Sequence, residues 1–380
     1  MFQLHPNDVE RDQIAKFVFG DAFSDRWDGP ASRAYFDHYC SVVCPAEPGD
    51  AVIYIGASAL RSHADVVRCA RILRENPLLS FNDYVGQAMS DKETTTAALK
   101  EKAHVARTVV AVTFMINCSL GDYHAVGLER NDPVWAKWEG DVRFASFVRD
   151  AFTQQLSPTE EQKGRVFDAI AHKKSLKAWK LAKRYDIKIR PTNNLLEHLA
   201  YDAGTKILKV FHQVFFLRAH LAVTKNQPLE LGFEESLAIP LTRCRGTLPP
   251  RLLLETLLTL HTILYPIIDT GDEKSYASLE KAIRRHAFDE EAMLIEFVRT
   301  VPPDMVFRYW GDRLTRLHEA VRRPPPTNAV VSWFERHTSE RNALTVAIVG
   351  LFLAALFGFL SFLVGLLQLV LAWVAWKHPN

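Results

Sequence analysis

The sequence predicts a mainly α-helical protein, with a helical soluble region, a few short strands and one C-terminal transmembrane helix. Three observations support this. Apolar residues recur at helical spacing through most of the chain, the β-branched runs are short, and Leu344–Trp376 contains no charged residue. An apolar run of at least 18 residues is typical of a transmembrane helix, because only a helix satisfies its own backbone in lipid.

The apolar run is longer than one membrane crossing requires. At about 1.5 Å per residue, a helix of this length is about 50 Å long, against a hydrocarbon core of about 30 Å. We therefore expect the helix to tilt or to extend beyond the core. Two full spans do not fit in the run, and a shallow re-entrant hairpin is the alternative.

Small side chains and one glutamine recur along this run at alternating steps of four and three residues. We call them the small-residue seam: Ala347, Gly350, Ala354, Gly358, Ser361, Gly365, Gln368 and Ala372. Small residues let membrane helices approach closely, so the seam predicts helix–helix packing and a possible homo-oligomer. The alternative is that glycine and alanine are simply common in membrane helices.

Aromatic and basic residues flank the run and indicate an orientation. Trp333, Trp373 and Trp376 are predicted to lie at the two membrane interfaces. Basic residues before the run outnumber Lys377 after it, which places the N-terminal region in the cytosol: Arg322, Arg323, Arg336 and Arg341. The first residues show no signal-peptide pattern, so we expect a tail-anchored, single-pass protein; the organelle is left open. Five cysteines without framework spacing suit a reducing compartment.

Composition shifts and proline runs predict four regions. These are an N-terminal helical region at 1–165, a second helical region at 166–321, a Pro-rich spacer with a juxtamembrane helix at 322–341, and the anchor at 342–376. The spacer contains Arg322-Arg-Pro-Pro-Pro326, a stiff polyproline sequence.

Individual elements follow from periodicity, caps and proline stops. Helices are predicted at 9–23, 31–44, 62–76, 93–103, 106–118, 132–151, 157–182 (broken near Ala171), 214–223, 248–266, 273–287, 305–321 and 327–341. Short strands are predicted at 51–56 and 206–211, and Asn194 with Glu197 resembles a capping box that starts a helix.

The segment His172–Arg190 is strongly basic, with Asp186 as its only acidic residue. Leu176, Trp179 and Ala182 recur at steps of three, so one face of a helix would be apolar. Such a segment suits the anionic surface of the cytosolic leaflet. The alternative is a solvated helix that turns Trp179 into the core.

Three motifs and the tail resemble a large, uncharacterised family of proteins from filamentous fungi. The motifs are Thr192–Leu199, Leu248–Pro266 and Tyr309–Leu314, and the tail carries Phe357-Gly358 followed by Gly365. The resemblance covers about residues 170–376, and the first half does not align. It implies a fungal source and a single membrane anchor. The family has no biochemical function to carry over, so no site residue follows from it.

Known catalytic and cofactor motifs are absent from the sequence. There is no P-loop, Gly-x-Ser-x-Gly elbow or His-Glu-x-x-His sequence, and Val52–Leu60 has one glycine where a dinucleotide site needs three. We therefore predict no catalytic, cofactor-binding or metal residue and no cofactor. Cys40 and Cys44 lie one helical turn apart, but without a second pair they read as buried structural cysteines.

Four histidines of the apolar half leave one question open. His198, His212, His220 and His261 would form a metal or acid–base cluster if they converged, although their spacing matches no ligand pattern. The alternative is that each is a separate core or surface histidine.

The sequence favours a tail-anchored, cytosol-facing protein that binds partners or itself at a membrane. A net charge of +2 gives no case for nucleic acid, and the lipid bilayer is the partner that the anchor implies. Alternatives are a membrane-tethered enzyme or accessory protein of fungal secondary metabolism, and a fungal incompatibility or cell-death factor. No substrate, reaction or protein partner can be identified.

Overall fold

The computed structural model describes residues 5–20, 30–44, 60–89, 96–118, 137–152, 160–238, 247–267, 272–295, 298–302, 305–322 and 343–377. The chain divides into two compact units, Met1–Arg322 and Arg323–Asn380. The regions predicted on either side of residue 165 both lie within the first unit. The described residues are mainly helical, with one small sheet and one long apolar C-terminal helix, which confirms the predicted fold class.

A series of helices opens the first unit. They are α1 (Asp8–Phe19), α2 (Arg33–Val43), α3 (His63–Glu75), α4 (Phe81–Ala88) and α5 (Thr96–Phe114). Asn7 and Glu10 form a capping box on α1, and Gly20, with φ 68°, ends this helix. Arg74 is buried and donates hydrogen bonds to the carbonyl oxygens of Phe17 (2.5 Å) and Val18 (3.0 Å), so a cation caps the carboxyl end of α1.

The structure of this half differs from the sequence-based expectation in two helices. The helices expected at 93–103 and 106–118 are one continuous helix, α5, because no helix-breaking residue separates them. The helix expected at 132–151 starts only at α6 (Phe144–Phe152), after Gly140 with φ 62° and a bridge between Ser80 and Arg143. The predicted strand 51–56 lies outside the described residues.

The basic segment forms several short elements. The α-helix α7 (Glu160–Ala171) is followed by the 3₁₀ turn η5 (Lys173–Ser175), α8 (Ala178–Arg184) and strand β1 (Lys188–Thr192). The predicted break near Ala171 is therefore confirmed, whereas the strand was not foreseen. Leu176, Ala178 and Leu181 are buried, whereas Trp179 is half-buried and Ala182 is exposed. The apolar face predicted at Leu176, Trp179 and Ala182 was therefore wrong beyond Leu176, because the helix restarts at Ala178 after the 3₁₀ turn and presents a different face to the core.

A three-stranded sheet lies beyond α8. Its order is β1–β3–β2, with β3 (Ile207–Phe211) parallel to β1 and antiparallel to β2 (Tyr201–Asp202). The helix start expected at Asn194 is a single 3₁₀ turn, η6 (Leu195–Glu197). Leu199, with φ 59°, ends the turn, and its N–H donates to Lys209 O (2.9 Å), which directs the chain into the sheet.

Helices complete the first unit. They are α9 (Val214–Val223), α10 (Phe233–Ala238), α11 (Pro250–Leu258), the π-helical η7 (Thr259–Leu264), α12 (Glu273–His286), the 3₁₀ turn η8 (Glu290–Met293) and α13 (Gly311–Arg322). Every residue of α11 is buried, as its nearly uniform apolarity predicts. The helix expected at 305–321 starts at Gly311, because residues 308–310 donate their N–H groups to the side chain of Glu255.

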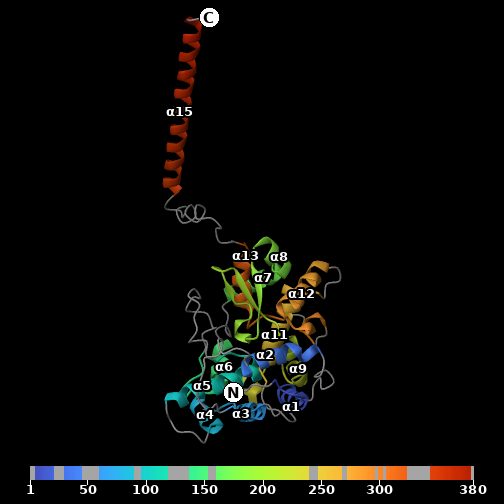
Figure 1. The fold of residues 1–380 in the computed structure, drawn as a ribbon. Helices are drawn as coiled ribbons and strands as arrows, with labels where there is room; N and C mark the ends of the chain where they lie inside the picture. Colours follow the sequence, from blue (N-terminus) through green and yellow to red (C-terminus); the bar gives the residue numbers. More distant parts are fainter. Residues whose placement is uncertain are drawn as a thin grey trace. The chain divides into compact units, whose positions relative to one another are not determined.

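The elements of the first unit gather at two ends (Figure 1). Helices α1 and α3–α6 lie at one end, and the sheet with α7, α8 and α13 lies at the other. Helix α13 packs on α7, and a Cβ added at Gly311 would lie only 2.9 Å from Val166 Cγ2. A glycine is therefore required for the close approach of these two helices.

The second unit contains α15 (Ala343–Lys377). The prediction for 344–376 agrees with it to within one residue at each end. The juxtamembrane helix expected at 327–341, including Trp333, lies outside the described residues.

Candidate functional site

Helix α15 is long and apolar enough to cross a membrane. The span Gly350–Trp373 has 24 residues and a mean hydropathy of 2.4, and none of it is buried against other described parts of the chain. A core helix of a soluble protein with this composition would be covered by its own fold. The exposed apolar surface of α15 is therefore compatible with a membrane anchor.

The seam forms one stripe of α15. At 3.6 residues per turn, the described members fall within an arc of about 80° around the axis: Gly350, Ala354, Gly358, Ser361, Gly365, Gln368 and Ala372. An added Cβ at any of the three glycines would meet nothing within 4 Å, so this face is open. The side chain of Ala347 lies outside the described residues. Packing against a partner helix remains a prediction.

The two described tryptophans of the anchor are exposed near its carboxyl end. Their exposed fractions are 58% for Trp373 and 80% for Trp376. The Lys377 ammonium lies 5.1 Å from the centroid of the Trp373 ring. An aromatic ring beside a basic side chain is typical of the headgroup region of a bilayer. The interfacial position of both residues stays a prediction.

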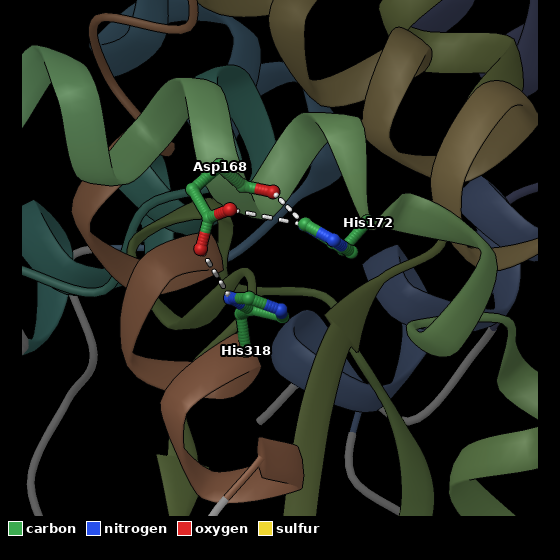
Figure 2. Close-up of side chains that lie close together, drawn as sticks. All are labelled: Asp168, His172 and His318. Atoms are coloured by element: carbon green, nitrogen blue, oxygen red, sulfur yellow. Dashed lines mark hydrogen bonds and ion pairs between the residues drawn. The ribbon is translucent and has the colours of Figure 1, made fainter.

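A cluster of titratable side chains lies where α7 meets α13. Figure 2 shows Asp168 near the end of α7, His172 directly after that helix, and His318 from α13. One ligand-type atom of each residue lies within 4.8 Å of the others. Among the described residues, this is the one group of three or more His, Cys, Asp or Glu side chains that meets this criterion.

Asp168 holds the cluster together. The Nδ1 atom of His172 lies 2.9 Å from the main-chain oxygen of Asp168 and 3.0 Å from its carboxylate Oδ1. Because a carbonyl oxygen only accepts, His172 carries its proton on Nδ1. The other carboxylate oxygen lies 3.9 Å from His318 Nδ1 and 3.7 Å from an Arg322 nitrogen. The Asp168 carboxylate therefore lies close to three basic side chains, those of His172, His318 and Arg322.

The two imidazole rings are stacked, with centroids 5.6 Å apart and planes 15° apart. Their surroundings differ. The side chain of His172 is 64% exposed and held by Asp168, whereas that of His318 is 10% exposed, where α13 packs on α7. The arrangement offers two nitrogen donors and one carboxylate, a ligand set used by zinc and non-haem iron, on the surface of the first unit.

The sequence analysis did not identify this cluster. The spacing of Asp168 and His172 was a usable signal, because residues four apart on a helix lie on one face. No local pattern connects either residue with His318, which enters the cluster only because α13 packs on α7.

The four histidines of the apolar half do not converge among the described residues. None belongs to a group of three metal-type ligands, and each has its own surroundings. His212 accepts the Asp289 N–H (3.2 Å), His261 donates to the Ala292 carbonyl oxygen (2.9 Å), and His220 lies against the Phe216 ring. Burial lowers the pKa of His212 to about 3 and that of His261 to about 4, so both are neutral core residues.

His198 belongs to a polar network that joins the three sequence motifs. Its Nδ1 accepts the Phe211 N–H (3.2 Å), so Nε2 carries the proton and donates to Thr259 Oγ1 (2.7 Å). The Trp310 indole donates to Thr256 Oγ1 (2.8 Å). Arg313 donates to the carbonyl oxygens of Leu196 (2.7 Å) and His198 (2.6 Å).

Glu255 completes this network from inside α11. Its carboxylate accepts the N–H groups of Arg308 (2.8 Å) and Tyr309 (2.7 Å) and the Arg251 side chain (3.1 Å). Burial raises its pKa to about 7, while these hydrogen bonds and the guanidinium oppose that rise. All of these partners are residues of the chain itself. The motif residues therefore stabilise the fold of the first unit.

No protein-family model, curated protein or solved structure matches this chain.

Proposed function

We propose that α15 spans a membrane once and holds the unit Met1–Arg322 on the cytosolic side, as in a tail-anchored protein. The observation that carries this proposal is the 24-residue apolar span, none of which is buried by the described part of the chain. Burying such a surface in hydrocarbon stabilises it by roughly 25 cal/mol per Å², and the helix satisfies its own backbone there.

The charge distribution supports the orientation. Arg322, Arg323, Arg336 and Arg341 precede α15, while Lys377 is the basic residue at its other end. Lysine and arginine are retained on the cytosolic side during insertion, so this bias favours a cytosolic first unit. In this arrangement the anchored unit binds partners or, through the seam, a second copy of the chain.

The test maps both ends of the chain in microsomes that carry the full protein. We expect the protein to stay in the membrane pellet at alkaline pH. A tag at residue 1 should be digested by added protease, and a glycosylation acceptor placed after residue 380 should be modified. Release of the protein by carbonate would overturn the membrane span. Digestion of the tag at residue 1 with an unmodified acceptor, and without release by carbonate, would indicate a re-entrant helix.

A membrane-tethered enzyme is the second candidate, and one observation favours it. The carboxylate of Asp168 orients His172, and an imidazole held by a carboxylate is a recurring general base. The sequence contains no nucleophile motif to accompany this pair. We therefore rank the partner-binding anchor first.

A further inference from the structure

We propose that Asp168, His172 and His318 bind one divalent transition-metal ion of the zinc class. The group goes beyond the proposed anchor, because it lies within the first unit and needs no membrane. Its three side chains come from three points of the chain: the last turn of α7, the residue after it, and the middle of α13. Helix packing thus brings together donors that are 146 residues apart in sequence.

The donor types select the class of ion. Two imidazole nitrogens and one carboxylate are borderline ligands that suit Zn²⁺, Co²⁺, Ni²⁺ or Fe²⁺. Calcium and magnesium prefer oxygen ligands throughout, so this set disfavours them. Three protein ligands around a four-coordinate ion leave a position for water, which is the arrangement of catalytic zinc rather than structural zinc.

The separations are close to those that an ion requires. At metal–ligand distances of about 2.0–2.2 Å, the ligands of a tetrahedral zinc site lie about 3.3 Å apart. The three atoms here lie within 4.8 Å of one another, so the largest approach required is about 1.5 Å. The Asp168 carboxylate already lies 3.0 Å from His172 Nδ1 and 3.9 Å from His318 Nδ1. Because His172 Nδ1 carries a proton towards Asp168, His172 would bind the ion through this nitrogen after losing that proton, or through Nε2 after the ring turns.

Two exposed side chains supply the movement. The rings are nearly parallel, so one must turn before both nitrogens point at a common centre. His172 is 64% exposed, so its ring has room to turn once Nδ1 gives up its hydrogen bonds to Asp168. Arg322, whose side chain is 71% exposed, contacts the carboxylate and would leave when a cation arrives. His318 is buried on α13, which packs on α7, so the site has one fixed and one adjustable imidazole.

Metal binding would also stabilise the packing of α13 on α7 in the first unit. His318 lies in α13, whose last residue is Arg322, and Asp168 and His172 lie in or beside α7. An ion that binds only this folded arrangement stabilises it by mass action. We therefore expect an upward shift of the thermal unfolding midpoint with added ZnCl₂, in addition to binding itself.

The experiment titrates ZnCl₂ into the chelator-treated full chain in detergent, with calorimetry as the readout and CoCl₂ as a spectroscopic probe. We expect one saturable site and a visible Co²⁺ absorption typical of nitrogen and oxygen ligands. His172→Ala should weaken zinc binding by more than about tenfold. Because its side chain is exposed, this variant should fold normally; Asp168→Asn removes the carboxylate without changing the size of the side chain.

The matched control is His286→Ala, which removes an exposed histidine of α12 outside the cluster. It should leave zinc affinity unchanged. The proposal is overturned if the wild-type chain takes up no zinc, or if His172→Ala and Asp168→Asn bind it as tightly as the wild type. Equal weakening by His286→Ala would show nonspecific uptake by surface histidines and would also overturn it.

Discussion

The Nη1 atom of Arg313 lies 2.6 Å from the carbonyl oxygen of His198, although 115 residues separate them in the chain. The same nitrogen donates to the Leu196 carbonyl oxygen at 2.7 Å. The guanidinium also lies over the Trp310 ring, 5.4 Å from its centroid. One buried cation therefore ties α13 to the turn that leads into the sheet, and it connects two of the motifs seen in the sequence.

Replacing Arg313 by methionine should destabilise the first unit. The substitution keeps an unbranched side chain but removes the donor, which leaves two buried carbonyl oxygens without this partner. A buried group that loses its hydrogen bond costs about 1–3 kcal/mol, so we expect the free energy of unfolding to fall by about 3 kcal/mol. Urea unfolding of the detergent-solubilised full chain measures this change.

The matched control for that variant is Arg316→Met, one turn further along α13. Arg316 is 55% exposed and pairs with Asp312 at 2.8 Å, which is an ordinary surface ion pair. We expect a loss below about 1 kcal/mol. Equal effects of the two substitutions would contradict the role assigned to Arg313.

Glu255→Gln should be as damaging as the Arg313 substitution. The amide keeps the volume of the carboxylate but places an N–H₂ group against backbone donors of Arg308 and Tyr309. We expect a loss of about 3 kcal/mol, because a buried ion pair with Arg251 is also broken. Chemical denaturation measures it. Glu319→Gln, on an exposed part of α13, should stay within about 0.5 kcal/mol of the wild type.

Stability should depend on pH through the buried histidines. Burial lowers the pKa of His261 from 6.5 to about 4 in the folded chain. Between these values the unfolded chain binds a proton that the folded chain does not, so His261 favours folding above pH 6.5 and this contribution is lost as the pH falls towards 4. The change from pH 7.5 to pH 5 is about 2 kcal/mol.

The variant His261→Gln isolates this contribution. Its amide keeps a donor for the Ala292 carbonyl oxygen but does not titrate. Glu255 and Asp289 act in the opposite direction, since burial raises the pKa of each to about 7 and their protonation favours the fold as the pH falls. Both carboxyl groups are present in the wild type and in the variant, so their contributions cancel when the two pH dependences of stability are subtracted. An unchanged pH dependence in His261→Gln would refute the assignment.

Enlarging the seam should weaken self-association of α15. Gly358→Leu places a bulky side chain where close helix contact is predicted, and we expect association to weaken by about 1 kcal/mol or more. Energy transfer between labelled full-length chains in vesicles measures the dimer fraction. Leu363→Phe enlarges the opposite face and should leave it unchanged. If the wild-type protein stays monomeric at every lipid ratio tested, the prediction that the small-residue seam packs against a second helix is wrong.

Local patterns predicted most of the helices because their signals lie within a few residues. The Asn7–Glu10 capping box marks α1, Pro250 marks the first turn of α11, and an uncharged run marks α15. The boundaries that were wrong depend on distant partners. Gly311 starts α13 only because Glu255 takes the preceding N–H groups, and strand β1 forms only because β3 pairs with it.

The sequence by itself determined the helical class and the long apolar C-terminal helix, because caps, periodicity and hydrophobic length act within a single segment. It also supplied the seam residues, which need only the helical repeat. Tertiary structure alone decided that His198, His212, His220 and His261 lie in separate surroundings and that His318 meets Asp168 and His172. These outcomes depend on which helix faces pack together, and that choice is made by the whole core.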